Sequence, residues 1–218
     1  MSENNQKSSN FRLILLAVFV GAISAVAGIT VWRITTIQQQ HHPSDASLMV
    51  LPEPKVIADF ALVDGQGQPF SLEDLRGQWS LMFFGFTHCP DVCPSALYDL
   101  NLITEGLDAA EKGKSADVQV VFVSVDPERD TPEQLAQYVS YFNPEFIGVT
   151  GSDAQLAPMT MQMGIAYRIE EHEAGAQRYD VYHSASVLLM DPRGRLHGVF
   201  PAPHNPEKMT SELAELID

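Results

Sequence analysis

Residues 79–86 form an apolar run that constrains the fold of this chain more than any other feature. Their sequence, Trp-Ser-Leu-Met-Phe-Phe-Gly-Phe, is nearly continuous in apolar side chains, as expected of a central strand covered on both faces of a sheet. The segment 89–94, Cys-Pro-Asp-Val-Cys-Pro, follows, and apolar residues then recur at helical spacing. Because proline suits the first helical position, we predict a helix that begins at Pro94. A buried strand therefore leads through two cysteines into a helix.

A second strand-and-helix unit follows the first. Residues 118–125 are apolar enough for another buried strand, and Thr131 with Gln134 forms a capping-box pattern that starts a helix ending near residue 142. The other predicted elements are a hairpin over 60–63 and 68–72, a strand at 146–149, a helix at 154–164, a hairpin over 186–190 and 195–200, and a helix at 206–217. Alternating strands and helices predict an α/β fold with a mixed sheet covered by helices.

Residues 13–32 are twenty positions without a charged side chain. At about 1.5 Å per residue, a helix of that length spans roughly the 30 Å core of a bilayer. Lys7 and Arg12 precede this segment and Arg33 follows it, which predicts a cytoplasmic amino terminus at 1–12 and export of the remainder. A cleaved signal peptide is the alternative, because residues 25–27, Ala-Val-Ala, resemble a cleavage site. The apolar run continues beyond that site, which favours an anchor.

The predicted domains follow from these boundaries. Residues 33–55 lack periodicity and are interrupted by prolines, so we predict a tether there and a folded domain at 56–218. The sequence carries 13 Lys and Arg against 28 Asp and Glu, a net charge of −15. Such a surface repels a phosphate backbone, which excludes nucleic acid as a partner and suits a basic protein.

Cys89 and Cys93 are the two cysteines of the chain, so at most one internal disulfide can form. In helical geometry, thiols four residues apart share one face, where both can reach one ion or each other. A plain disulfide would close a very short loop and add little stability. The pair is also compatible with a redox enzyme, a metal site or a regulatory thiol. A third ligand would decide among them.

Spacing alone does not choose that ligand among the histidines. His88 adjoins Cys89, but we expect its side chain to point away from the face of the two cysteines. His183 precedes an apolar strand and is plausible on position. The seven histidines are His41, His42, His88, His172, His183, His197 and His204.

Two other groups of metal-binding side chains have ordinary structural interpretations. Met159, Met161 and Met163 are spaced along one predicted helix, where methionine more often packs than binds copper. His41 and His42 lie in the predicted tether, where a solvated segment is the simpler interpretation. We therefore leave both groups out of the predicted site.

Together, several motifs resemble those of the SCO/SenC family of copper chaperones. The similarity covers about residues 51–204 and rests on residues 85–94 (Gly-Phe-Thr-His-Cys-Pro-Asp-Val-Cys-Pro), 123–132 (Val-Ser-Val-Asp-Pro-Glu-Arg-Asp-Thr-Pro), 183–184 (His-Ser) and 191–194 (Asp-Pro-Arg-Gly). This resemblance implies a thioredoxin-like fold and a copper ion, Cu(I) or Cu(II), bound by Cys89, Cys93 and His183. The family usually has Asp where this chain has Tyr182, a departure that affects the surroundings of His183 rather than the ligands themselves.

The resemblance also implies a function. We expect a metallochaperone, not a turnover enzyme, that delivers copper to the dinuclear copper centre of cytochrome c oxidase. Its expected partners are the copper-bearing oxidase subunit and an upstream copper donor, with the soluble domain on the periplasmic or extracytoplasmic side of the inner membrane. The main alternative is a membrane-tethered thiol-disulfide oxidoreductase that reduces the cysteines of that centre. A copper or redox sensor and a peroxidase are the remaining alternatives.

Overall fold

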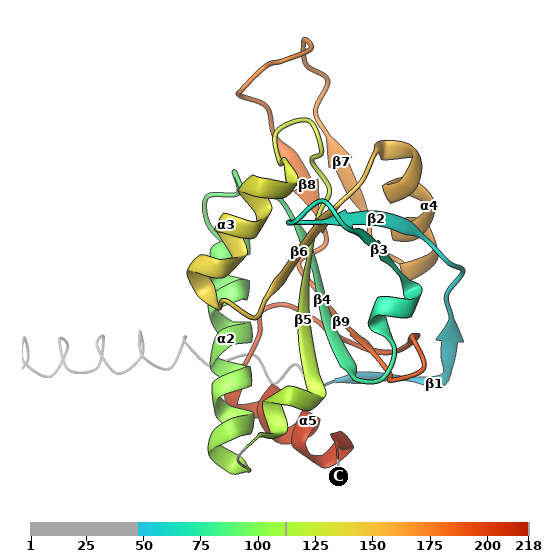
Figure 1. The fold of residues 1–218 in the computed structure, drawn as a ribbon, viewed down its shortest axis with the longest axis vertical. Coiled ribbons are helices and arrows are strands. Elements are labelled where there is room, and N and C mark those ends of the chain that lie inside the picture. The colour runs from blue at the N-terminus through green and yellow to red at the C-terminus, as the bar shows by residue number, and fades with distance from the viewer. Residues whose placement is uncertain (1–47, 112, 218) are drawn as a thin grey trace, which may run out of the picture. The chain divides into compact units, whose positions relative to one another are not determined.

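The computed structural model describes residues 48–111 and 113–217 (Figure 1). The predicted cytoplasmic segment 1–12, the anchor 13–32 and most of the tether lie outside these residues. Among the residues described, no helix combines the length and the apolar character that crossing a bilayer requires.

An eight-stranded mixed sheet forms the centre of the fold, with the strand order β1-β10-β9-β4-β5-β6-β2-β3 (Figure 1). β4, β5 and β6 are parallel, and the remaining pairs of neighbouring strands are antiparallel. The strands are β1 (Met49–Val56), β2 (Ala61–Asp64), β3 (Pro69–Ser71), β4 (Trp79–Gly85), β5 (Val118–Ser124), β6 (Ile147–Thr150), β9 (Val187–Met190) and β10 (Arg195–Phe200). A separate two-stranded sheet contains β7 (Tyr167–Ile169) and β8 (Val181–His183).

Helices cover the sheet on both sides. The helices are η1 (Leu72–Leu75), α2 (Val92–Ala110), η2 (Lys114–Asp117), α3 (Pro132–Phe142), α4 (Asp153–Met163) and α5 (Pro206–Ile217). α2 packs against α5 and α3, while α4 lies on the other side of the sheet (Figure 1). Every residue of β5 is buried and so is all of β4 beyond Trp79, as their apolar sequences require.

The α/β prediction is confirmed, including the two strand-and-helix units and both hairpins. α3 begins with the predicted capping box, in which the Thr131 side chain accepts from the Gln134 N–H and the Gln134 side chain accepts from the Thr131 N–H. One boundary differs, because α2 begins at Val92 rather than Pro94. Cys93 therefore lies in the first turn of the helix, and Cys89 lies in the loop before it.

The tether prediction is wrong for residues 49–55, which belong to β1. This strand pairs with β10, from Met49 opposite Val199 to Val56 opposite Arg195. β1 is an edge strand and its register shifts between Val50 and Lys55, so the prolines at 52 and 54 remove no essential hydrogen bond. Prolines that suggest a linker in the sequence are here compatible with an edge strand.

Candidate metal centre

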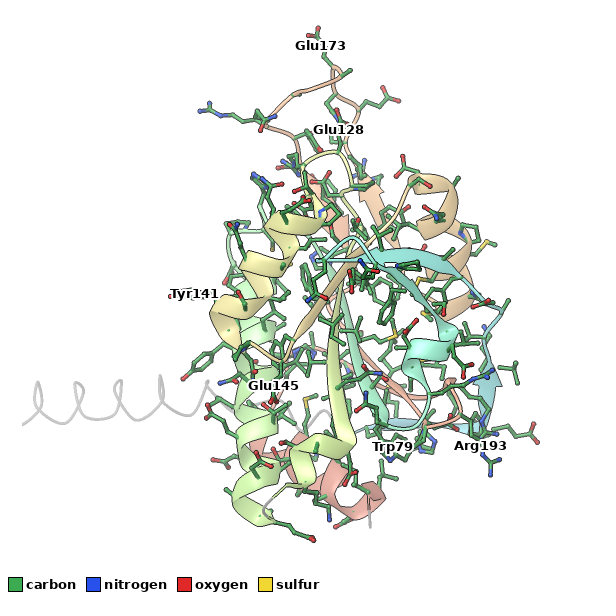
Figure 2. All side chains as sticks on the ribbon, in the orientation of Figure 1. Trp79, Glu128, Tyr141, Glu145, Glu173 and Arg193 are labelled. Carbon is green, nitrogen blue, oxygen red and sulfur yellow. The ribbon has the colours of Figure 1, made fainter. Side chains whose placement is uncertain are left out.

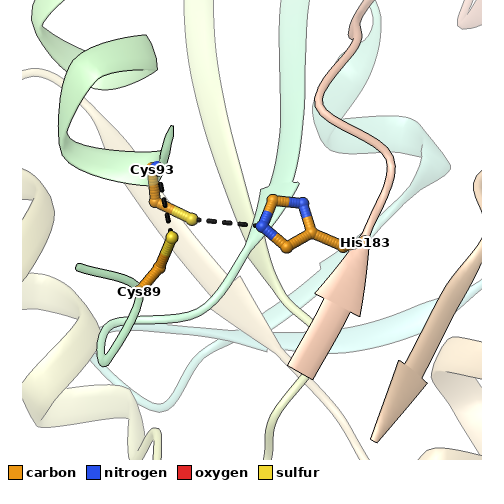
Figure 3. A group of neighbouring side chains, drawn as sticks. All are labelled: Cys89, Cys93 and His183. Atoms are coloured by element: carbon orange, nitrogen blue, oxygen red, sulfur yellow. Dashed lines mark hydrogen bonds between the residues drawn. The ribbon is translucent and has the colours of Figure 1, made fainter. Parts of the chain in front are cut away.

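Cys89, Cys93 and His183 come together at the end of the sheet where β4 meets α2 (Figure 3). β4 leads to Cys89, the first turn of α2 carries Cys93, and β8 ends at His183. One ligand atom from each residue lies within 4.8 Å of the other two. No other group of at least three His, Cys, Asp or Glu side chains with this spacing occurs in 48–111 and 113–217.

The distances between the three side chains suit a single soft metal ion. The Cys93 sulfur lies 3.4 Å from His183 Nε2, and the three ligand atoms all lie within 4.8 Å of one another. The Cys93 backbone N–H also donates to the Cys89 sulfur over 3.4 Å. Ligand bonds of about 2.0 to 2.3 Å place neighbouring ligand atoms of a three-coordinate ion roughly 3.5 to 4 Å apart. The three donors therefore need only small adjustments to share one ion.

The imidazole of His183 is oriented with Nε2 toward the sulfurs. Its Nδ1–H donates to the Ser184 backbone carbonyl over 3.0 Å, which leaves the Nε2 lone pair free for a metal. The rings of Phe83 and Phe86 meet the imidazole edge to face, each with its centroid 5.9 Å away. A backbone carbonyl and two aromatic rings thus hold His183 in a metal-binding orientation.

The two thiols are electrostatically unequal. The hydrogen bond from the Cys93 thiol lowers the pKa of Cys89 to about 4, with smaller contributions from backbone groups and His183. The same hydrogen bond and burial raise the pKa of Cys93 well above its ordinary value. In the metal-free reduced chain, Cys89 is therefore a thiolate at neutral pH and Cys93 holds the proton that the pair shares.

We expect Cys89 to be alkylated quickly at mildly acidic pH, because the thiolate is the reactive form. Its rate with iodoacetamide should change less than about twofold between pH 8 and pH 6, whereas an ordinary thiol would slow by roughly a hundredfold. Peptide mapping by mass spectrometry should locate the label on Cys89, since Cys93 is buried. The variant Cys93→Ala removes the thiol donor, so a rate that fell no more between pH 8 and pH 6 in this variant than in the native protein would contradict the assignment.

Gly85 allows the Cys93 sulfur to approach the sheet. A Cβ at position 85 would lie 2.6 Å from the Cys93 sulfur and 3.0 Å from the Phe122 ring. Contacts that short would force the sulfur or the ring to move. The glycine that precedes the cysteine segment is therefore required by close packing at the site.

A buried carboxylate that sequence reasoning missed fixes the loop that carries Cys89. Asp130 is fully buried and accepts hydrogen bonds from the Thr87 backbone N–H at 2.8 Å, the Thr87 hydroxyl at 2.6 Å and the Ser124 hydroxyl at 2.6 Å. In the sequence, this segment belongs to a motif of the resembled family, and helix capping was a sufficient structural reason for it. Asp130 instead joins the β4–α2 loop to the end of β5.

A second polar cluster fixes the long loop between β7 and β8. The Arg129 guanidinium bonds to the buried Asp126 carboxylate and stacks on the Tyr179 ring at 3.6 Å, while the Tyr179 hydroxyl donates to Asp126 over 2.6 Å. Farther out, His172 lies 2.8 Å from Glu128, the residue labelled below the loop tip at Glu173 (Figure 2). Residues 126–129 thus support the loop that leads to His183.

Other side chains that could bind copper include His88 and the three methionines of α4, which the structure describes. The His88 Nδ1 lies 3.1 Å from the Thr87 hydroxyl and 3.6 Å from Asp130, outside the Cys-Cys-His group. Met159 and Met163 are buried in the core, as the packing interpretation requires, whereas Met161 is 79% exposed. The described residues do not include His41 and His42.

Tyr182 does not contribute to the orientation of His183. The Arg168 guanidinium lies 4.6 Å above the Tyr182 ring, and the side chain is exposed. The Ser184 carbonyl, not the side chain at position 182, accepts the Nδ1–H of His183. The departure at Tyr182 therefore leaves the orienting hydrogen bond of the imidazole intact.

Comparison with known proteins identifies one family. The SCO1/SenC family model matches residues 50–218. Among similar proteins, the SCO2-like protein of Rickettsia felis is 36% identical over 159 residues, which cover 73% of this chain and 76% of the relative. The mitochondrial SCO2 homolog of Homo sapiens is 39% identical over 155 residues, covering 71% of this chain and 57% of the human protein. A crystal structure of ScoI from Arabidopsis thaliana with copper bound has a TM-score of 0.66 and 33% identity, covering 73% of this chain and 96% of that one.

Proposed function

This chain belongs to the SCO1/SenC family, and on that premise we propose that it is a copper metallochaperone. It binds one copper ion through Cys89, Cys93 and His183 and delivers the ion to the dinuclear copper centre of cytochrome c oxidase. The observation that carries the proposal is the convergence of two sulfurs with a histidine Nε2 whose opposite nitrogen is already hydrogen-bonded. It acts as a carrier and not as a turnover enzyme.

The donor set fits copper on chemical grounds. Soft thiolates favour Cu(I), and imidazole suits copper in either oxidation state. Solved relatives with copper bound, from Arabidopsis thaliana and from yeast, share the fold of this chain. Three protein ligands leave a position at which a thiol of an acceptor can bind before the chaperone releases the ion, which a closed four-ligand site would resist.

A thiol-disulfide oxidoreductase is the second candidate, and the unequal thiols favour it. The Cys89 thiolate can attack a disulfide of a target and form a mixed disulfide, and Cys93 then displaces the target thiol. In balance, the two thiols of this chain become one disulfide, while the target gains two electrons and two protons. This reaction needs Cys89 and Cys93 but gives His183 no direct role.

We further propose where the chaperone acts. Residues 13–32 anchor it in the inner membrane, with residues 1–12 in the cytoplasm and the folded domain on the periplasmic or extracytoplasmic side. Its partners are an upstream copper donor and the copper-bearing subunit of the oxidase. The net charge of −15 suits basic surfaces on such partners and disfavours nucleic acid.

His183→Ala separates the two candidate functions. We expect the reduced native protein to bind one Cu(I) under anaerobic conditions and the variant to lose at least about tenfold in affinity, because one of three ligands is gone. Competition against a Cu(I) chelator measures both affinities. His88→Ala is the matched control, since it removes a histidine beside Cys89 that lies outside the group.

Equal and weak copper binding by the native protein and His183→Ala would contradict copper delivery. If both proteins also exchanged disulfides at the same rate, the oxidoreductase function would replace it.

A further inference from the structure

A groove runs beside the metal centre, between the start of α2 and two loops. It encloses about 490 Å³. Asp91, which lies between the two cysteines in sequence, and Ala185, two residues after His183, both line it, so the groove adjoins the segments that carry the three donors. Its lining residues are Asp91, Val92, Ser95, Ala96, Asp99, Ala185, Ala202, Pro203 and His204.

One wall of the groove carries two carboxylates without partners. Asp91, Ser95 and Asp99 are spaced four residues apart along the start of α2 and line the same side of the helix. Within 48–111 and 113–217, the carboxylates of Asp91 and Asp99 make no hydrogen bond or ion pair. Partial burial raises the pKa of Asp99, so its charge lacks full hydration as well as a partner.

A second lining residue, His204, holds a buried acceptor that lacks a donor. His204 Nε2 is buried and has no hydrogen-bond partner among the described residues. The Phe200 backbone bonds to the ring, and burial lowers the pKa of His204, so the ring is neutral with Nε2 as an acceptor. A buried acceptor without a donor costs free energy in the free chain.

The rest of the groove is apolar or small. Val92, Ala96, Ala185, Ala202 and Pro203 line this part, and no Lys or Arg lines the groove. Val92 is 43% exposed at the entrance. An occupant should therefore combine an aliphatic stem with a cationic, donor-rich end.

We propose that this groove docks an arginine-bearing segment of the protein that exchanges copper with the centre. The inference rests on the proposed function and adds the docking surface and its chemistry. A guanidinium offers five N–H donors on an aliphatic stem, which matches carboxylate acceptors above an apolar wall. Bound there, the segment holds its own metal ligands beside Cys89.

Two short blocked peptides without cysteine test the groove, Gly-Arg-Leu-Arg-Gly and its counterpart Gly-Gln-Leu-Gln-Gly. We expect the arginine peptide to shift the backbone amide NMR signals of the groove residues in the reduced, metal-free protein, saturably and more weakly at high salt. Asp99→Asn should weaken this binding by roughly fivefold. Glu105→Gln, an equal loss of charge on an exposed part of α2, is the control and should change it little.

Several results would overturn the proposal. They are equal binding of the two peptides, shifts spread over the whole acidic surface, and equal effects of Asp99→Asn and Glu105→Gln. If the amide NMR signals of the groove residues shifted with protein concentration in the absence of peptide, the groove would bind a second copy of this chain instead. The Cu(I) affinity of the same variants should stay unchanged, because the groove residues are not metal ligands.

Failure of the native protein to bind copper would count against the proposed function. It would not count against the groove, because peptide binding is measured without metal.

Discussion

Replacing Cys93 with alanine should lower Cu(I) affinity by more than about a hundredfold, the largest loss that we expect from any single substitution. Removing a group that only orients a ligand already costs about ten- to a hundredfold, and Cys93 is itself a proposed ligand. Its sulfur contacts His183 Nε2, and its backbone N–H contacts the Cys89 sulfur, so it is the central member of the group. Without it, Cys89 and His183 offer copper two ligands and no third.

The copper measurement needs a check on folding, because Cys93 is buried. Truncating the thiol to a methyl group leaves a small void, and we expect a loss of about 1 kcal/mol in unfolding free energy. Ser95→Ala, on the same turn of α2, is the matched control and should leave Cu(I) affinity unchanged. Near-native affinity in a folded Cys93→Ala protein would move the metal site elsewhere and overturn the proposed ligands.

Local patterns were sufficient to predict most of the fold. β4 and β5 are continuous apolar runs because parallel central strands are covered on both faces, and this property is visible in each segment alone. The capping box at Thr131 is likewise contained within four residues. Elements that depend on a distant partner were missed. β1 needs β10 to pair with, and the three-residue strands β7 and β8 are too short to show a period.

The candidate site was predictable in part for the same reason. Cys89 and Cys93 are four residues apart, so their proximity follows from the sequence. His183 lies ninety residues beyond Cys93, and only the family resemblance selected it among seven histidines. Its orienting bond to the Ser184 carbonyl depends on local backbone geometry that residue types do not reveal. Asp130 was missed because its bonds to Thr87 span 43 residues.

Asp130→Ala should produce the largest loss of stability among the polar residues around the centre, about 2 to 4 kcal/mol. The substitution leaves three donors without an acceptor, namely the Thr87 N–H, the Thr87 hydroxyl and the Ser124 hydroxyl. Urea unfolding measures the loss, and Asp117→Ala, which removes an exposed carboxylate, is the control.

The same substitution should also weaken copper binding, because Asp130 fixes the loop that leads to Cys89. Asp130→Asn keeps the size of the side chain and one oxygen acceptor, so we expect it to retain more stability and more Cu(I) affinity than Asp130→Ala. A loss of Cu(I) affinity that persists in fully folded Asp130→Ala protein distinguishes a positioning role from general destabilisation. If Cu(I) affinity in the folded Asp130→Ala protein equalled that of the native chain, the carboxylate would support the fold alone, and the bond to Thr87 would have no part in placing the thiolate.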